Sequence, residues 1–172
     1  LAGPVVAACV VLDRSAVDDL RGVDDSKACT EARRNELAAA IREKATAAAV
    51  ADASVEEIDR LNIREAGRLA MQRALEAVAG ELRVDHLLVD ARTVPGVHLP
   101  QSSIVKGDSR SLSIAAASIL AKVARDALMV EAASSFPGFG FDRHKGYGTK
   151  EHLLAIERLG LTPLHRRSFA PV

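Results

Sequence analysis

Apolar residues recur every three to four positions in several stretches of the chain, and this spacing predicts amphipathic helices. Ser54 and Glu57 predict a capping box at the start of one of them. Gly80 and Gly160 stand where the apolar periodicity ends, a position that glycine commonly takes after a helix. The predicted helices cover residues 31–44, 56–61, 63–79, 113–134 and 150–159.

A second pattern consists of short apolar runs bounded by polar and turn residues, which is typical of buried strands. It predicts strands near residues 4–12, 45–51, 86–90 and 102–105. Strands mixed with helices indicate an α/β protein, although periodicity alone names no particular fold within that class. The helix at 63–79 also carries a continuous apolar stripe that we expect in the core. The stripe consists of Ile63, Ala66, Ala70, Ala74, Leu75 and Val78.

One acidic residue, Asp126, lies in the helix predicted over residues 113–134, which is otherwise built for burial. We therefore expect its carboxylate to have little contact with solvent. An ionised carboxylate in such a place needs a cation or hydrogen-bond donors. Either Lys122 or Arg125 satisfies it locally, as on an ordinary charged helix face, or the carboxylate points at a metal ion.

A second acidic residue, Asp90, ends the strand predicted at residues 86–90. Layered α/β proteins bind ligands at the carboxyl ends of their strands, but an aspartate there can equally cap the following turn. Together with Asp126, Asp90 favours a shared site for a hard divalent cation. Mg²⁺ is usually held by one or two carboxylates and by phosphate oxygens of the substrate.

The glycine-rich segment at residues 139–149 holds the only tyrosine of the chain, Tyr147. The segment is too rich in glycine to form the interior of a helix or strand. Lys145 suits a phosphate, Gly146 allows close approach of the backbone to a ligand, and an exposed ring offers a face to a sugar or base. In the alternative interpretation, the tyrosine fills a gap beneath a loop.

Charge is balanced over the chain, with 23 basic and 23 acidic residues. Bulk electrostatics therefore give no argument for a nucleic-acid partner, and such binding would depend on local patches. One candidate is the basic stretch at residues 162–169, for which a solvated tail is the alternative. The other candidates are lysines that could equally be solubilising groups: Lys27, Lys106, Lys122 and Lys145.

A chain of 172 residues with 48% hydrophobic content suits a single domain, residues 1–172, with a substantial core. Cys9 and Cys29 match neither a metal-binding spacing nor a disulfide framework, and a reducing cytoplasm fits them. No apolar run approaches the about 20 residues that a membrane-spanning helix needs, so no membrane partner is expected.

Several longer motifs occur in a fixed order along the chain. They are Asp24-Asp25-Ser26-Lys27, Leu88-Val89-Asp90, Val105-Lys106-Gly107-Asp108, His144-Lys145-Gly146-Tyr147, and the runs at residues 58–63, 115–126 and 165–169. Their order closely resembles that of bacterial ribonuclease HII, over essentially the whole chain. Strings of this length are far more specific than a short glycine motif.

The resemblance implies a ribonuclease H-like α/β fold, a mixed five-stranded sheet flanked by helices. It also implies an endonuclease that cleaves the RNA strand of RNA/DNA hybrids and nicks duplex DNA on the 5′ side of an embedded ribonucleotide. Two Mg²⁺ or Mn²⁺ ions roughly 4 Å apart would activate a water and stabilise the leaving oxygen, leaving a 3′-hydroxyl and a 5′-phosphate. Asp90 and Asp126 match the family's metal ligands.

The remaining candidates concern the substrate. The resemblance implies that Tyr147 packs on the sugar next to the cleaved junction, with Lys145 and Gly146 helping to hold the strand. Ser26 and Lys27 match a motif near the substrate, where Lys27 would contact a backbone phosphate; a turn with a solvent-exposed lysine is the alternative. Two more residues are expected near the site: His165 and Arg166.

One departure from the family pattern is serious. Just before the equivalent of Leu1, family members carry a first strand ending in Asp-Glu and then a Gly-Arg-Gly turn. The resemblance implies that this Asp-Glu pair supplies two of the four metal-binding carboxylates. It also implies that the glycine turn recognises the 2′-hydroxyl. We therefore expect upstream residues in the full molecule and no activity from the chain as written.

The same departure concerns the fold. In the family the first strand lies in the middle of the sheet, between the strands predicted at residues 4–12 and 86–90. Without it, these two strands would face each other with unpaired edges, which is costly where they are buried.

Two other function classes stay open. The protein could be a nucleic-acid-binding module that has lost catalysis but retains Tyr147 and the basic loops, or a purely structural fragment of a larger assembly. For the nuclease, the expected partners are RNA/DNA hybrid and ribonucleotide-containing duplex DNA, and the protein is expected to be a monomer.

Overall fold

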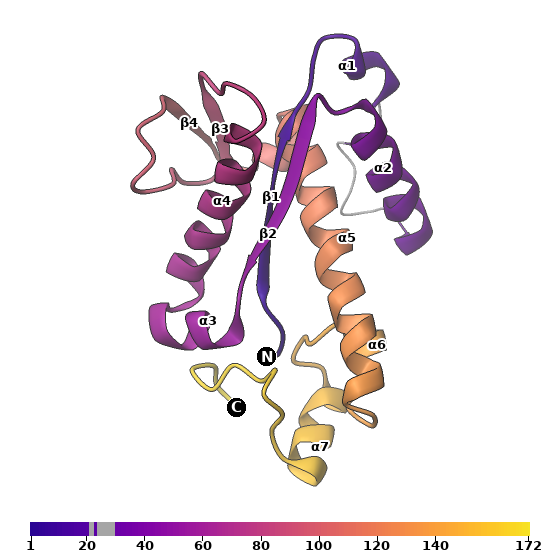
Figure 1. Cartoon of the computed structure of the whole chain (residues 1–172). Helices are drawn as coiled ribbons and strands as arrows, with labels where there is room; N and C mark the ends of the chain where they lie inside the picture. The colour runs from indigo at the N-terminus through magenta and orange to yellow at the C-terminus, as the bar shows by residue number, and fades with distance from the viewer. Residues whose placement is uncertain (21–22, 24–29) are drawn as a thin grey trace.

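A computed structural model describes residues 1–20, 23 and 30–172 of the chain (Figure 1). Ser26 and Lys27, two of the expected substrate residues, lie outside the described residues, as does Cys29. The elements are β1 (Val5–Val11), α1 (Ala16–Asp19), α2 (Glu31–Lys44), β2 (Ala47–Ala53), α3 (Val55–Leu61), α4 (Ile63–Ala79), β3 (Leu87–Asp90), β4 (Gln101–Ile104), the short 3₁₀ helix η2 (Gly107–Ser109), α5 (Leu112–Ser135), α6 (Phe141–His144) and α7 (Lys150–Leu159).

The predicted helices and strands are all present. Helices α2, α4 and α7 begin and end at the predicted residues, and α3 and α5 differ by one residue at most at each end. Strand β2 lies two residues later than predicted. The prediction missed the short elements α1, η2 and α6. At α6 the glycine-rich segment forms a single helical turn, flanked by left-handed residues at Gly140 (φ 76°) and Lys145 (φ 50°).

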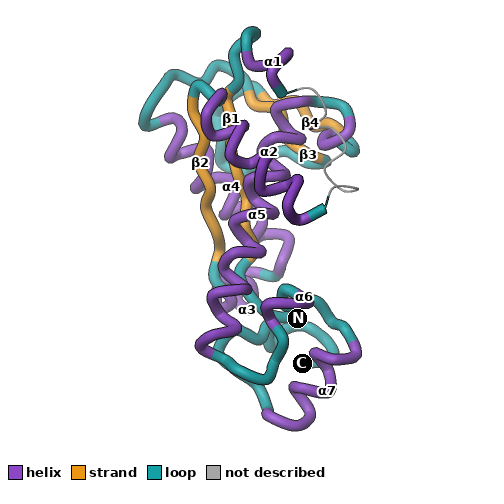
Figure 2. Tube along the Cα trace, turned by 90° about the vertical axis from the view of Figure 1, so that its right-hand side faces the viewer, coloured by secondary structure: helices purple, strands orange, loops and turns teal. Residues whose placement is uncertain are grey.

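Strands β1 and β2 form an antiparallel ribbon that runs between α4 and α5 (Figures 1 and 2). Side chains alternate between the two faces of a strand, so β1 contributes to a different core on each side. Ala7 packs with Ala66 and Ala70 of α4. Val10 packs with Ile119 and Leu120 of α5. The predicted apolar stripe of α4 is therefore core, except that Ile63 at its first turn is exposed.

Strands β3 and β4 form a separate parallel pair, in register from Leu87↔Gln101 to Asp90↔Ile104. In the part of the chain that the structure describes, neither β1 nor β3 pairs along its second edge. Both strands instead line one cavity of about 400 Å³, whose wall on the third side is the first half of α5. The expected arrangement, in which β1 and β3 face each other without a strand between them, is what the structure has.

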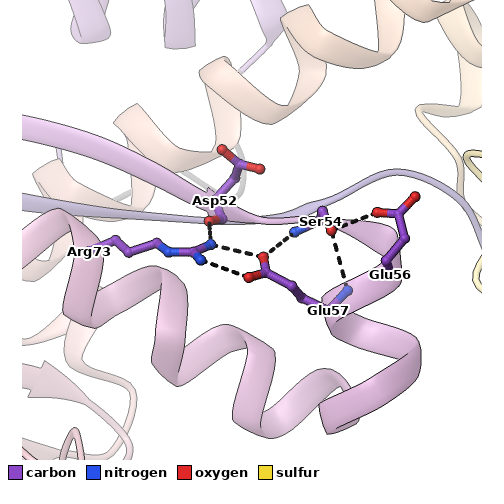
Figure 3. A network of polar contacts seen from close by, with 5 residues as sticks. All are labelled: Asp52, Ser54, Glu56, Glu57 and Arg73. Carbon is purple, nitrogen blue, oxygen red and sulfur yellow. Dashed lines mark hydrogen bonds and ion pairs between the residues drawn. The ribbon is translucent and has the colours of Figure 1, made fainter.

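A polar network joins β2, α3 and α4 (Figure 3). Ser54 and Glu57 form the predicted capping box, in which the Ser54 hydroxyl accepts the Glu57 N–H and the Glu57 carboxylate accepts the Ser54 N–H. The Arg73 guanidinium donates to both oxygens of Glu57 at 2.7 and 2.8 Å and also to the Asp52 carbonyl. These bonds lower the pKa of the Glu57 carboxyl to about 2. The network links α4 to α3 and to the end of β2.

Asn62 connects these two helices and offers a stability test. Its side chain caps α4 by accepting the N–H groups of Arg64 and Glu65, and its backbone is at φ 72° and ψ 160°, a region that favours glycine. Replacing Asn62 with Ala removes the cap and retains the strain, so we expect the free energy of unfolding to fall by about 2 kcal/mol. Asn62→Gly relieves the strain and should cost clearly less. Urea melts of both variants test this, and equal losses would contradict it.

No helix within residues 1–20, 23 and 30–172 is both long and apolar enough to cross a bilayer.

Candidate active site

Helix α5 carries Asp126 into the protein, as the apolar periodicity predicted. The Asp126 side chain is buried, and its Oδ1 lies 2.7 Å from Lys122 Nζ, one turn earlier on the helix. Residues four apart on a helix lie on the same face. Of the two cations that could have partnered Asp126 locally, the structure therefore selects Lys122.

Asp90 stands at the end of β3, where it is exposed to solvent on one side. Its Oδ1 accepts a hydrogen bond of 2.8 Å from the backbone N–H of Gly107. A Cβ at that position would lie 2.6 Å from Ile114 Cδ1 and 3.3 Å from Asp90 Oδ1, so a larger residue would require these side chains to shift. The carboxylate is thus held against the loop that leads into α5.

Asp90, at the end of β3, lies near the first turn of α5, whereas Asp126 lies farther along that helix, and the two are not gathered into a ready-made metal cage. Asp90 lines the cavity between β1 and β3, and the α5 wall of that cavity reaches Ala121, one turn and a little more before Asp126. Within the described ranges, no three His, Cys, Asp or Glu side chains form a group that could hold a metal. Two carboxylates do suit Mg²⁺ or Mn²⁺ in kind, because Mg²⁺ commonly takes one or two carboxylates and completes its shell with water and substrate phosphate.

Tyr147 is an exposed ring beside this part of α5. The side chain is 56% exposed, so the alternative that it fills a gap beneath a loop is wrong. Arg125 Cζ lies 5.2 Å and Lys122 Nζ 5.5 Å from the centre of the ring, within the range of cation–π attraction. The structure therefore brings the tyrosine loop to the turn of α5 that carries Asp126.

The residues before Tyr147 hold its loop to the rest of the protein. A Cβ on Gly146, which has φ 80°, would lie 2.5 Å from the carbonyl oxygen of Ala2, so the close approach that this glycine permits is to the protein's own backbone. The Lys145 side chain is buried; its Nζ donates to the Asp142 carbonyl and lies 4.0 Å from Glu31 Oε2. Both residues support the loop in the described structure.

The basic stretch at residues 162–169 is not a solvated tail. His165 is 1% exposed and Arg166 is 8% exposed. Arg166 Nε donates to the Gly3 carbonyl at 2.8 Å, and its Nη2 donates to the Pro4 carbonyl. Burial, reinforced by the nearby charge of Arg125, lowers the pKa of Arg166 to about 10. Both residues are near the tyrosine loop, as expected, but their polar atoms contact protein.

The sequence did not predict the position of Arg125, which lies beside the Tyr147 ring. Its Nη2 donates to the Ala2 carbonyl at 3.2 Å, while its Nη1 is buried without a hydrogen-bond partner among the described residues. A buried unpaired donor is costly, and a guanidinium beside an exposed ring suits an anionic or carbonyl acceptor. Helical spacing could not reveal this, because Arg125 follows the pattern of a surface residue.

The match with known protein families decides the identification. The model of the family described as Ribonuclease HII matches residues 1–172, the whole length of the chain. The chain belongs to the ribonuclease HII family. The resemblance expected from the motif order is confirmed.

Proteins described as ribonuclease HII are similar in sequence to this chain over its full length. That of Myxococcus xanthus is 56% identical over 173 residues, and that of Chromohalobacter salexigens is 55% identical over 172 residues. Each alignment covers 100% of this chain, but 58% of the first relative and 84% of the second. The chain thus spans less than two thirds of some relatives and most of others.

Solved structures confirm the ribonuclease H-like fold. The crystal structure of ribonuclease H2 from Pyrococcus horikoshii OT3 matches with a TM-score of 0.76 and 23% identity, covering 98% of this chain and 88% of that one. Bst-RNase HIII in complex with Mn²⁺ matches with a TM-score of 0.76 and 19% identity, covering 98% and 63% respectively. At such low sequence identities, the similarity shows that the fold is shared and nothing more.

Proposed function

We propose that this protein is an endonuclease that cleaves the RNA strand of RNA/DNA hybrids and nicks duplex DNA on the 5′ side of an embedded ribonucleotide. The observation that carries the proposal is the placement of an exposed tyrosine ring beside a buried carboxylate, Tyr147 beside the Asp126 turn, in a member of the ribonuclease HII family. A flat exposed ring suits a sugar or base, and a buried carboxylate suits a cation.

Asp90 and Asp126 would hold the Mg²⁺ or Mn²⁺ ions of a two-ion site, together with oxygen ligands from substrate and from other carboxylates. When bound, such ions activate a water and stabilise the leaving oxygen, which leaves a 3′-hydroxyl and a 5′-phosphate. The Mn²⁺ complex of the Bst-RNase HIII neighbour supports this choice of ion. Binding of an ion at Asp126 Oδ1 would displace Lys122 Nζ, whose side chain is 35% exposed and can turn toward solvent.

Arg125 supplies a contact for the sugar-phosphate backbone. Once the side chain turns toward the substrate, its unpaired Nη1 would donate a hydrogen bond to a phosphate oxygen, which removes an unfavourable feature of the free protein. Lys122, 5.5 Å from the centre of the Tyr147 ring, adds a second positive charge on the same face. This local pair of cations provides the electrostatic attraction for nucleic acid that the zero net charge of the chain does not provide.

The other candidates divide into three groups. Ser26 and Lys27 would contact the strand, with Lys27 on a backbone phosphate. Lys145 and Gly146 would act on the strand through Tyr147, since their own contacts are to protein. His165 and Arg166 would support the loop from within the protein.

We place the activity in a reducing cytoplasm and assign it to a monomer.

A nicking assay tests the proposal. The substrates are a DNA duplex with one ribonucleotide, an RNA/DNA hybrid and an all-DNA duplex, each with Mg²⁺, Mn²⁺ or a chelator. The enzyme is a longer chain that carries the family's Asp-Glu and Gly-Arg-Gly segment before Leu1, with the 172-residue chain beside it. We expect the longer chain to nick only the first two substrates, only with metal, and the shorter chain to be inactive. Metal-independent binding without cleavage by the longer chain would favour the binding-module alternative.

A further inference from the structure

Three imidazoles lie buried beneath the tyrosine loop. They come from α6, α7 and the C-terminal segment: His144, His152 and His165 are 8%, 0% and 1% exposed. The rings of His144 and His152 stack with their centres 4.4 Å apart, and those of His152 and His165 are 5.2 Å apart. The proposed nuclease chemistry gives no role to such a cluster, and His152 matched no motif.

The backbone determines which nitrogen of His165 carries the proton. The N–H of Thr162 donates to His165 Nδ1 at 2.9 Å, so Nδ1 must accept. A neutral His165 therefore carries its proton on Nε2. That nitrogen lies 3.1 Å from His152 Nε2, with both atoms buried.

The proton of His165 in turn determines the state of His152. Because His165 Nε2–H donates, His152 Nε2 must accept, and the proton of a neutral His152 lies on Nδ1. His152 Nδ1 is 2.9 Å from the carbonyl oxygen of Tyr147, to which it can donate. The bonds thus form a one-way relay, from Thr162 N–H through His165 and His152 to the Tyr147 carbonyl.

His144 holds the adjacent peptide in the same manner. The N–H of Gly146 donates to His144 Nδ1 at 3.2 Å, and His144 Nε2 lies 2.7 Å from the Phe139 carbonyl. Consecutive residues of the loop are therefore bound to stacked imidazoles, Gly146 through its N–H and Tyr147 through its carbonyl. The ring of Tyr147 is then directed outward, over the cations of α5.

We propose that His152 and His165 are positioning residues, which hold the backbone of Tyr147 so that its ring is preorganised for the sugar of the substrate. The link to a sugar rests on the proposed function; the link to the position of the ring does not. A group fixed before binding loses less conformational entropy on binding. The relay should therefore act on substrate binding more than on the chemical step.

The relay works only while both imidazoles are neutral. An added proton on His152 Nε2 would set two donors against each other between the rings. An added proton on His165 Nδ1 would face the Thr162 N–H, and its remaining acceptor would be the Thr162 hydroxyl oxygen at 2.9 Å, so the bond to the Thr162 N–H would be lost. Burial, with the positive charges of His144, His165 and the Leu1 amino group, lowers the pKa of His152 from 6.5 to about 4, opposed by its bond to the Tyr147 carbonyl. Burial also lowers the pKa of His165. The acid that faces the cluster from α7 is Glu151, which interacts with His144.

The cluster does not have the character of a metal site. Each of the ring nitrogens described above is already engaged with a backbone group or with the other imidazole. Within residues 1–20, 23 and 30–172, no group of three or more His, Cys, Asp or Glu side chains could hold a metal ion. A structural role in the loop is what the hydrogen-bond directions support.

Tyrosine fluorescence tests the relay directly, because Tyr147 is the only tyrosine and the chain has no tryptophan. His152→Phe fills the space but removes both hydrogen bonds, and His152→Asn places an amide donor near the position of Nδ1. We expect lower anisotropy of Tyr147 and a KM for the ribonucleotide duplex raised about tenfold in His152→Phe, with kcat within about twofold of the parent. His152→Asn should restore most of both values. The control is His86→Phe, at an exposed histidine outside the cluster.

A folded His152→Phe variant with unchanged anisotropy overturns the proposal. If that variant does not fold, a pH titration of the parent decides: we expect the Tyr147 anisotropy to fall around the pKa of His152, between about pH 5 and pH 3, before the far-UV circular dichroism changes. Constant anisotropy over that range overturns the proposal. If no protein nicks the duplex, the proposed function fails, while the fluorescence result on the relay still stands.

Discussion

Replacing Asp126 with Asn is expected to reduce metal-dependent nicking by the longer chain more than about 100-fold, and Asp90→Asn should do the same. An amide keeps the shape of the carboxylate but removes its negative charge and one strong oxygen ligand. The fold should survive, because the amide oxygen at residue 126 can still accept from Lys122 Nζ, and residue 90 is exposed. The loss would therefore lie in binding the ions, not in stability.

Single-turnover nicking of the ribonucleotide duplex over a range of Mg²⁺ concentrations measures this effect. The matched control is Glu131→Gln, which makes the same change of charge on an exposed residue of the same helix α5. It should cleave at the parental rate. If Asp90→Asn and Asp126→Asn both retain full cleavage, the assignment of these carboxylates to the metal is wrong.

The long elements could be predicted from the sequence because local signals agree there with the tertiary structure. For α4, the apolar stripe ends at Val78 and Gly80 follows it, so both the buried face and the end of the helix are encoded locally. Strand β2 is alanine-rich and carries no clear boundary signal. Its limits depend instead on its pairing with β1, which places Val5 opposite Ala53.

Site residues could be predicted only where their neighbours in the sequence determine whether the side chain is buried or exposed. Asp126 was expected to be buried because its helical neighbours are apolar, and Tyr147 was expected to be a candidate because glycines surround it. The burial of His165 and Arg166 was missed because it depends on contact with residues 1–4, about 160 positions away. No periodicity encodes such contacts. The spacing of His144, His152 and His165 likewise gives no sign that they meet.

The cavity between β1 and β3 connects the fold with the site. Asp90 is at its edge and α5, the helix of Asp126, forms its wall. Any extended segment that paired with both strand edges would bury the apolar lining and add its own side chains close to the end of β3. A segment of this kind that carried carboxylates would therefore act on the fold and on the site together, and the nicking assay compares two chain lengths for that reason.

Tyr147→Ala is expected to lower kcat/KM on the ribonucleotide duplex by about tenfold to a hundredfold, whereas Tyr147→Phe should have little effect. The physical reason is that stacking on a sugar or base needs the ring, and both rings present the same face. The side chain is 56% exposed, so neither variant should unfold the protein. The alanine variant also leaves Arg125 and Lys122 without the ring that now lies beside them.

Steady-state nicking by the parent, Tyr147→Ala and Tyr147→Phe measures the change in kcat/KM, and thermal melts check that the variants are folded. Leu154→Ala is the control for losing an exposed apolar side chain, since Leu154 on α7 is 54% exposed and should leave cleavage unchanged. Parental activity in both Tyr147→Ala and Tyr147→Phe would show that the ring does not contact the substrate. A loss in Tyr147→Phe as large as in Tyr147→Ala would instead transfer the role from the aromatic face to the hydroxyl. Stacking then could not explain the contribution of Tyr147 to cleavage, because the phenylalanine ring would offer the same face to the sugar.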